Sequence, residues 1–189
     1  MKYIQIHQYR ALAQFQKRMS GRVKCVLFDM DGLLLDTENL YTEGTQRILS
    51  EFGHVYDWEF KSQLMGKRTE EVARMIVDHY HLPMTPDEWV QRSSQIYQEL
   101  FPHVKSLRGV SKLVHHLARH KVPVAVASSS STSSYQLKTV QHSGLFSLFD
   151  AVVLGDDERV QKAKPAPDIF LVAAASLGQS QSLSPVRPG

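Results

Sequence analysis

The chain has almost no cysteine: Cys25 is the only one among its 189 residues. A single cysteine excludes an internal disulfide, and its position within an apolar run predicts a small buried side chain. Because disulfides are rare in reducing compartments, this cysteine usage is compatible with a cytoplasmic protein, which is the localisation we expect.

Long apolar runs are also absent from the sequence. A membrane-spanning helix needs about 20 apolar residues in succession, and a secretory signal needs an apolar stretch near the N-terminus. The formal net charge of +3 is spread along the chain, without the basic stripe and interleaved aromatics typical of a nucleic-acid surface. We therefore expect no membrane and no nucleic-acid partner, and a small phosphorylated substrate instead.

Acidic residues are missing from residues 1–22, which contain five basic ones. Mitochondrial transit peptides share this bias, but they are rich in serine and this segment is not. We interpret residues 1–22 as an N-terminal extension exposed to solvent, with mitochondrial targeting as the minor alternative.

Two carboxylates, two positions apart, directly follow the first apolar run. The run Val23–Phe28 has the length and composition of a buried strand, and Gly32 marks a turn after Asp29-Met30-Asp31. In open parallel α/β sheets, ligands bind at the carboxyl ends of the strands. There Asp29 and Asp31 can share a magnesium ion and a phosphate, one as nucleophile and the other as proton donor. The alternative is an acidic turn exposed to solvent.

Helix signals follow one another in the next part of the chain. Thr37 is expected to cap the first helix, and Thr85-Pro86-Asp87-Glu88 has the capping-box arrangement at the start of the last one. Trp58 and Trp89 are expected to pack inside this all-helical segment. The expected helices cover 37–53, 58–65, 69–80 and 86–100.

From Gly109 onward, helices alternate with apolar strands. Such alternation implies βαβ units and a parallel sheet, so we predict an α/β fold with the helical segment inserted after the first strand. The expected helices cover 110–120, 132–142 and 167–177, and the expected strands cover 122–127 and 151–154.

Polar residues follow the two later strands as well. Ser128 and Ser129 come directly after a strand, where a hydroxyl and a backbone N–H can hold phosphate oxygens; the alternative is a serine-rich linker. Lys164 follows the last strand, and Pro165 and Pro167 restrain the backbone around it. This arrangement predicts an ammonium group at the same edge of the sheet.

Together these motifs, in this order and spacing, resemble the haloacid-dehalogenase-like phosphohydrolases. The motif residues are Phe28 to Thr37, Ser128, and Lys164 to Phe170. Within that superfamily, three further strings are similar to those of the pseudouridine-5'-phosphatases: 64–67, 146–149 and 153–157. The resemblance covers residues 23–177.

The resemblance implies a magnesium-dependent phosphomonoesterase with a phosphoaspartate mechanism. Its substrate would be a nucleotide or sugar phosphate, and pseudouridine 5'-phosphate by the closer resemblance. Asp29 would attack phosphorus, Asp31 would act as acid and base, and both would bind Mg²⁺. Ser128, Ser129 and Lys164 would bind the phosphate, and Lys164 would also offset its charge.

The resemblance also assigns the domains of a Rossmann-like parallel sheet core with an inserted all-helical cap. A loop containing Gly66, Lys67 and Arg68 would select the substrate, and closure of the cap would exclude water. We expect a monomer. The expected divisions are the extension at 1–22, the core at 23–37 and 107–177, the cap at 38–106, and a disordered tail at 178–189.

One motif of the family is missing from this sequence. The family has a further apolar strand ending in an acid, whereas residues 178–189 are rich in Ser, Gln and Pro. We therefore expect a sheet core incomplete at its C-terminal end, weaker magnesium binding and an exposed strand edge through which copies could self-associate. The alternative function is a catalytically impaired, truncated isoform that binds phosphate or a partner. A phosphomutase is a weaker alternative, because the same core supports both reactions.

Overall fold

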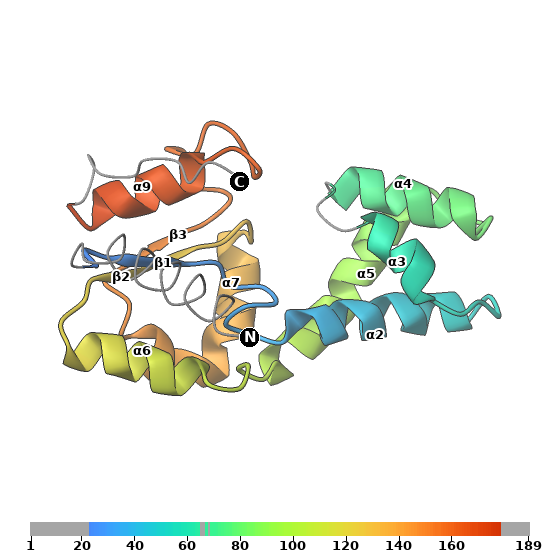
Figure 1. Ribbon diagram of the computed structural model, residues 1–189. Coiled ribbons are helices and arrows are strands. Elements are labelled where there is room, and N and C mark those ends of the chain that lie inside the picture. Colours follow the sequence, from blue (N-terminus) through green and yellow to red (C-terminus); the bar gives the residue numbers. More distant parts are fainter. Residues whose placement is uncertain (1–22, 65–66, 68, 179–189) are drawn as a thin grey trace, which may run out of the picture.

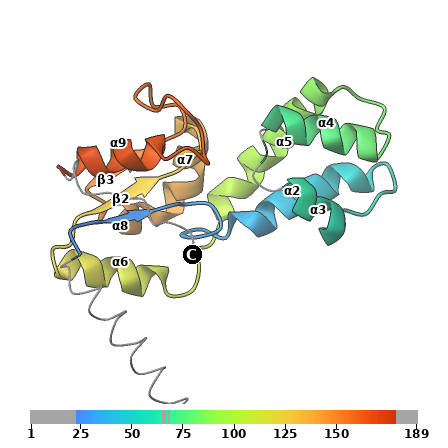
Figure 2. The same ribbon diagram turned by 45° about the horizontal axis from the view of Figure 1, so that its top comes forward.

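The computed structural model describes residues 23–64, 67 and 69–178. The chain forms two lobes (Figure 1). The α/β lobe comprises residues 23–36 and 104–178, and the helical lobe comprises the described residues of 37–103. Two long helices, α2 (Thr37–Ser50) and α5 (Pro86–Leu100), lead from the first lobe into the second, as both views show (Figure 2).

A three-stranded parallel sheet forms the centre of the α/β lobe. Its order is β1-β2-β3, and Leu27, Ala125 and Ala151 lie opposite one another across it. The predicted parallel sheet is confirmed, but β1 occupies only the end of the apolar run, since its pairing with β2 begins at Val26. The strands are β1 (Val26–Phe28), β2 (Val124–Ala127) and β3 (Ala151–Val153).

The two faces of the sheet are covered by different helices. Strand β2 alternates valine and alanine, so its valines face one side and its alanines the other. The valines join a cluster with residues of α6 (Val110–Arg119), and the alanines pack against α9 (Asp168–Ser176). Figure 1 shows these two helices on opposite faces. Because both faces are buried, the loops at the strand ends are the part of the sheet open to a ligand.

The single helix predicted over 132–142 is interrupted in the structure. The predicted range contains α7 (Thr132–Thr139) and a 3₁₀ turn η2 (Val140–His142), and a separate short helix α8 (Ser143–Phe146) follows it. The interruption brings Phe146 into the cluster beneath the sheet, where it stacks on Phe149 with 5.6 Å between ring centroids.

The helical lobe packs around its own apolar cluster. Its further elements are α3 (Trp58–Leu64), α4 (Thr69–His79) and the 3₁₀ turn η1 (Phe101–His103). Trp89 is 3 % exposed and belongs to this cluster, as predicted, but Trp58 is 68 % exposed, so its predicted packing role is wrong. The buried cluster contains Ile48, Leu49, Phe60, Leu64, Ala73, Ile76, Val77, Tyr80, Leu82 and Trp89.

The two predicted helix starts have different outcomes. The capping box at α5 is confirmed: the Glu88 N–H donates to Thr85 Oγ1 at 3.2 Å, and the Thr85 N–H donates to Glu88 Oε2 at 2.7 Å. The cap at Thr37 is wrong, because Asp36 occupies the N-cap position without a side-chain cap bond. The Thr37 hydroxyl instead accepts the Gly32 N–H at 3.2 Å, which ties the helix start to the loop after β1.

Strand β1 lies at the edge of the three-stranded sheet that the described residues form. Cys25, next to it, is only partly buried, short of the burial predicted for it. The predicted extension and all but the first residue of the predicted tail lie outside the described residues. No helix in the described part of the chain is long and apolar enough to span a membrane.

Candidate active site

Asp29 and Asp31 lie at the carboxyl end of β1, and Met30 between them is fully buried. Burial of Met30 in the core cluster leaves the two carboxylates on the loop, away from the core. The Met30 carbonyl accepts the N–H groups of residues 33, 34 and 35, which closes the loop into a compact turn. Gly32 has φ of 71°, a left-handed conformation that glycine adopts at little cost.

Ser128 joins the loop of β1 to the loop of β2. Its side chain is fully buried, and its hydroxyl donates to Asp31 Oδ2 at 3.2 Å. The same hydroxyl oxygen accepts the Ser130 N–H at 3.1 Å. Ser129 is exposed, and its backbone carbonyl packs so closely on Gly155 that a Cβ there would lie 2.4 Å from the oxygen. Of the two predicted phosphate-binding serines, only Ser128 contacts the carboxylate pair.

Lys164 pairs with the other carboxylate. Its Nζ lies 2.8 Å from Asp29 Oδ1 and donates to the Ala127 carbonyl at 3.0 Å. The side chain is 26 % exposed, so it remains accessible from the loop side. The four predicted residues Asp29, Asp31, Ser128 and Lys164 therefore gather at one end of the sheet.

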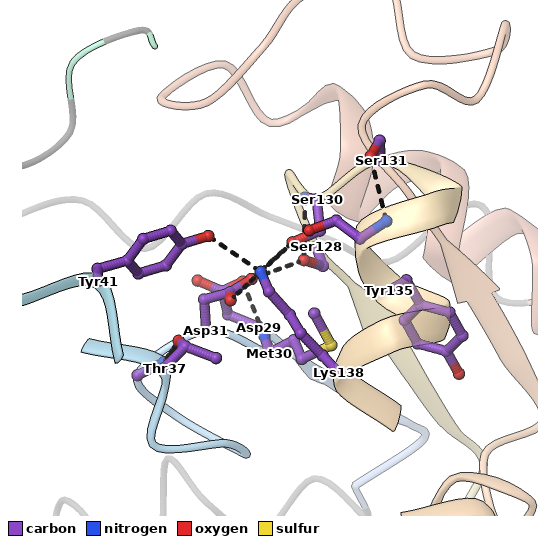
Figure 3. A network of polar contacts seen from close by, with 12 residues as sticks. Asp29, Met30, Asp31, Thr37, Tyr41, Ser128, Ser130, Ser131, Tyr135 and Lys138 are labelled. Carbon is purple, nitrogen blue, oxygen red and sulfur yellow. Dashed lines mark hydrogen bonds and ion pairs between the residues drawn. The ribbon is translucent and has the colours of Figure 1, made fainter. Parts of the chain in front are cut away.

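Lys138 also belongs to this site and was not predicted from the sequence. It lies on α7 with a fully buried side chain, and its Nζ is 2.6 Å from Asp31 Oδ1 (Figure 3). Burial raises the pKa of Asp31, but the charge and hydrogen bonds of Lys138, with a hydrogen bond from Ser130, outweigh it and hold that pKa below its ordinary value. A signal was available: Lys138 follows Tyr135 by three residues, on the helix face that packs on the core, where lysine is rare unless paired.

The predicted specificity loop is described only at Lys67. Its ammonium pairs with Glu71, four residues further along. Gly66 and Arg68 lie outside the described residues. Lys67 lines a cavity of about 340 Å³ within the helical lobe, together with Lys61 and the aromatic side chains Tyr41, Tyr56, Trp89 and Tyr97.

A second cavity lies between the helical lobe and α7. Its volume is about 370 Å³, and its lining includes Ser131 and Ser133 of the α/β lobe and Tyr97 and Phe101 of the helical lobe. Tyr41 lines both cavities, and its hydroxyl accepts a hydrogen bond from Lys138, the partner of Asp31.

Comparison with known proteins decides the family. The sequence profile of the haloacid dehalogenase-like hydrolases matches residues 26–183. The chain belongs to this family. It is 46 % identical over 158 residues to a Drosophila melanogaster protein named probable pseudouridine-5'-phosphatase. The matched region covers 83 % of this chain and 68 % of that protein. The resemblance predicted from the motifs is confirmed.

Other relatives carry different substrate names. (DL)-glycerol-3-phosphatase 2 of Arabidopsis thaliana is 41 % identical, over 82 % of this chain and 65 % of its own length. A solved haloacid dehalogenase-like protein from Agrobacterium tumefaciens superposes with a TM-score of 0.69 at 25 % identity, over 83 % and 70 % of the two chains. The chain spans about half to two thirds of the length of the first curated relatives it matches.

A magnesium ion at this site would find its donors among the oxygen atoms of the β1 loop. Among the described residues, the hydrogen bonds and ion pair of Asp29 use Oδ1, so Oδ2 remains for a cation. Both carboxylate oxygens of Asp31 are engaged by Lys138 and serines, which leaves its backbone carbonyl as the donor. Within the described residues, no three or more acid, histidine or cysteine side chains are grouped so that they could hold a metal ion. Two oxygens suit Mg²⁺, which is commonly held by one or two carboxylates with substrate phosphate and water.

Proposed function

We propose that this chain is a phosphomonoesterase that hydrolyses phosphate esters of small hydroxylated molecules through a phosphoaspartate. The supporting observation is that Asp29 and Asp31 stand together at the end of β1, with Ser128 and Lys164 in contact with them. The phosphatase names of the relatives point in the same direction.

In the first step, an Asp29 carboxylate oxygen attacks phosphorus, and the bond to the leaving oxygen breaks. Asp31 gives that oxygen a proton from its protonated form, which is a minor population because Lys138 holds the Asp31 pKa below its ordinary value; Lys164 offsets the negative charge at Asp29. In the second step, a water molecule attacks phosphorus, Asp31 takes its proton, and phosphate leaves. Bound Mg²⁺ would be held by the Asp29 carboxylate and the Asp31 carbonyl, and would supply charge neutralisation on the phosphoryl group.

We further propose that the helical lobe acts as the cap and selects the substrate. Support comes from its aromatic cavity, which has the size of a small-molecule site and contains Lys61 and Lys67 as cations. Nucleoside or sugar phosphates fit this combination, and pseudouridine 5'-phosphate and glycerol 3-phosphate are the substrates that the relatives' names suggest.

Phosphate release from purified full-length chain tests the proposal. With magnesium present, we expect hydrolysis of p-nitrophenyl phosphate, with kcat/KM at least about 10³-fold above that of Asp29→Asn. A panel of pseudouridine 5'-phosphate, glycerol 3-phosphate and fructose 1-phosphate then ranks the substrates. Equal activity of the original chain and Asp29→Asn would refute the proposal.

Two other functions are each favoured by one observation. Phosphate binding without turnover is favoured by the small number of metal ligands among the described residues, and protection against unfolding by phosphate without hydrolysis would support it. A mutase shares the fold, as in β-phosphoglucomutase of Clostridium difficile, with a TM-score of 0.63 at 19 % identity. Equal amounts of phosphate and free alcohol in the product would support hydrolysis over transfer.

A further inference from the structure

Lys138 is a buried charge that the reaction steps above do not use. We propose that Lys138 is a positioning residue: it fixes the orientation of the Asp31 carboxylate for proton transfer and links that orientation to the helical lobe through Tyr41. This inference rests on the proposed phosphomonoesterase function, because it concerns the acid and base of that reaction.

All three N–H donors of the Lys138 ammonium have partners. They are Asp31 Oδ1 at 2.6 Å, Ser130 Oγ at 2.9 Å and Tyr41 Oη at 3.0 Å, and Figure 3 shows these groups converging on the Nζ atom. An ammonium has three donors, so none is left for another ligand. Lys138 therefore cannot move without breaking a buried charged bond.

The opposite oxygen of the Asp31 carboxylate is held as well. Ser130 donates to Oδ2 at 2.9 Å and Ser128 donates to it at 3.2 Å. Since Lys138 fixes Oδ1 and the serines fix Oδ2, the carboxylate plane has one orientation. Loss of Lys138 would leave Oδ1 without its cation and release that plane.

Substrate cannot reach Lys138 directly. Its side chain is 0 % exposed, and aromatic rings cover it, with Nζ 4.6 Å from the Phe101 ring centroid and 5.3 Å from that of Tyr41. Lys164, by contrast, is partly exposed beside the proposed nucleophile. Lys138 therefore touches no reacting atom, and its direct contact with the reacting groups is the one with Asp31.

The contacts of Lys138 span both lobes. Tyr41 lies on α2 and Phe101 in η1 of the helical lobe, whereas Asp31, Ser130 and α7 belong to the α/β lobe. Burial raises the pKa of Tyr41, so its phenol stays protonated and offers a lone pair to the ammonium. A shift of the helical lobe would thus be felt at the carboxylate that handles the proton.

Leaving-group dependence tests this role. Glycerol 3-phosphate has an alkoxide leaving group that needs a proton, whereas p-nitrophenolate leaves without one. For Lys138→Met we expect kcat/KM to fall about 100-fold on glycerol 3-phosphate and about tenfold or less on p-nitrophenyl phosphate. Equal losses on the two substrates would show a merely structural role and overturn the proposal.

Matched variants sharpen the comparison. Lys112→Met makes the same change at an exposed position on α6 and should leave both activities unchanged. Lys164→Met removes the partner of Asp29 and should lower both activities by similar factors. Tyr41→Phe removes only one hydrogen bond from Lys138. Like Lys138→Met, it should lower kcat/KM more on glycerol 3-phosphate than on p-nitrophenyl phosphate, but by a smaller factor of about threefold to tenfold.

Folding and activity can be separated. If Lys138→Met does not fold, Tyr41→Phe and Ser130→Ala carry the leaving-group test, and the absence of selectivity in both would overturn the proposal.

If the original chain hydrolyses neither substrate, the proposed function fails, and melting temperatures of Lys138→Met, Asp31→Asn and the double variant still test the pairing. The double variant should lose less than the sum of the single losses. Additive losses would overturn the inference.

Discussion

The α/β lobe and the helical lobe bury different kinds of side chain. At the strand ends of the α/β lobe, Ser128 and Lys138 are fully buried and bonded to Asp31. The helical lobe instead buries an apolar and aromatic cluster, and its ion pair Arg47–Glu43 is about half exposed. Buried polar networks fix one geometry, whereas apolar clusters tolerate substitution of similar volume. A fixed geometry suits the α/β lobe, which holds the proposed reacting groups. A core that tolerates substitution suits the helical lobe, which is proposed to select the substrate.

Removal of the largest buried ring in the helical lobe should have the largest effect on stability. We expect Trp89→Ala to lower the free energy of unfolding by about 4 kcal/mol through the cavity it leaves. Trp89 also lines the aromatic cavity of the helical lobe, so hydrolysis by this variant is expected to fall as well. Urea denaturation followed by circular dichroism measures the free energy of unfolding.

The exposed Trp58 is the matched control for that substitution. Trp58→Ala should cost under about 1 kcal/mol, since its ring is mostly in solvent and the Lys61 ammonium lies as far as 5.7 Å from the ring centroid. A loss for Trp58→Ala as large as that for Trp89→Ala would contradict the difference in burial between the two rings.

The next largest effect is a difference in stability between variants that break an ion pair in each lobe. Lys138→Met leaves the Asp31 charge without its partner, and we expect a loss of about 3 kcal/mol. Arg47→Met breaks the exposed pair with Glu43 and should cost about 0.5 kcal/mol. Urea midpoints at low and high salt check both, because salt screens the exposed pair more strongly. Similar losses for the two variants would contradict the contrast between the lobes.

The sequence predicts those parts of the site that depend on local order. Asp29, Ser128 and Lys164 each follow a strand, and parallel strands end at the same edge, so their proximity follows from the pattern. Lys138 is different, because its partners Tyr41 and Asp31 lie 97 and 107 residues away in the chain. Only the packing of α7 against both lobes brings these groups together.

The same distinction explains the errors in the fold. The capping box at Thr85 is a contact between residues three apart, so sequence alone predicts it. Thr37 has the right residue type for a cap, but its hydroxyl is used by Gly32 in the loop after β1, a contact set by the turn geometry. Trp58 has the hydrophobicity of a core residue, but no element of the described structure covers it fully.

Loss of the α5 cap should have a smaller effect than loss of either buried group. Thr85→Ala removes the acceptor for the Glu88 N–H, and we expect a cost of about 1 kcal/mol. Thr85→Ser keeps a hydroxyl and should cost much less. Chemical denaturation distinguishes the two variants, and equal costs would show that the hydroxyl does not act as a cap.

The smallest expected effect is the pH dependence of that cap. The Thr85 backbone N–H and then its hydroxyl donate to Glu88 and hold the pKa of its carboxyl below the ordinary value of 4.5. A lowered pKa in the folded state means that the contribution is present above the unfolded pKa and disappears as pH falls through the folded one. Glu88→Gln removes this titration, so the stability difference between the original chain and the variant should shrink between pH 6 and about pH 3. Urea midpoints across this range measure the difference, and a constant difference would show that the carboxylate charge does not contribute to the cap.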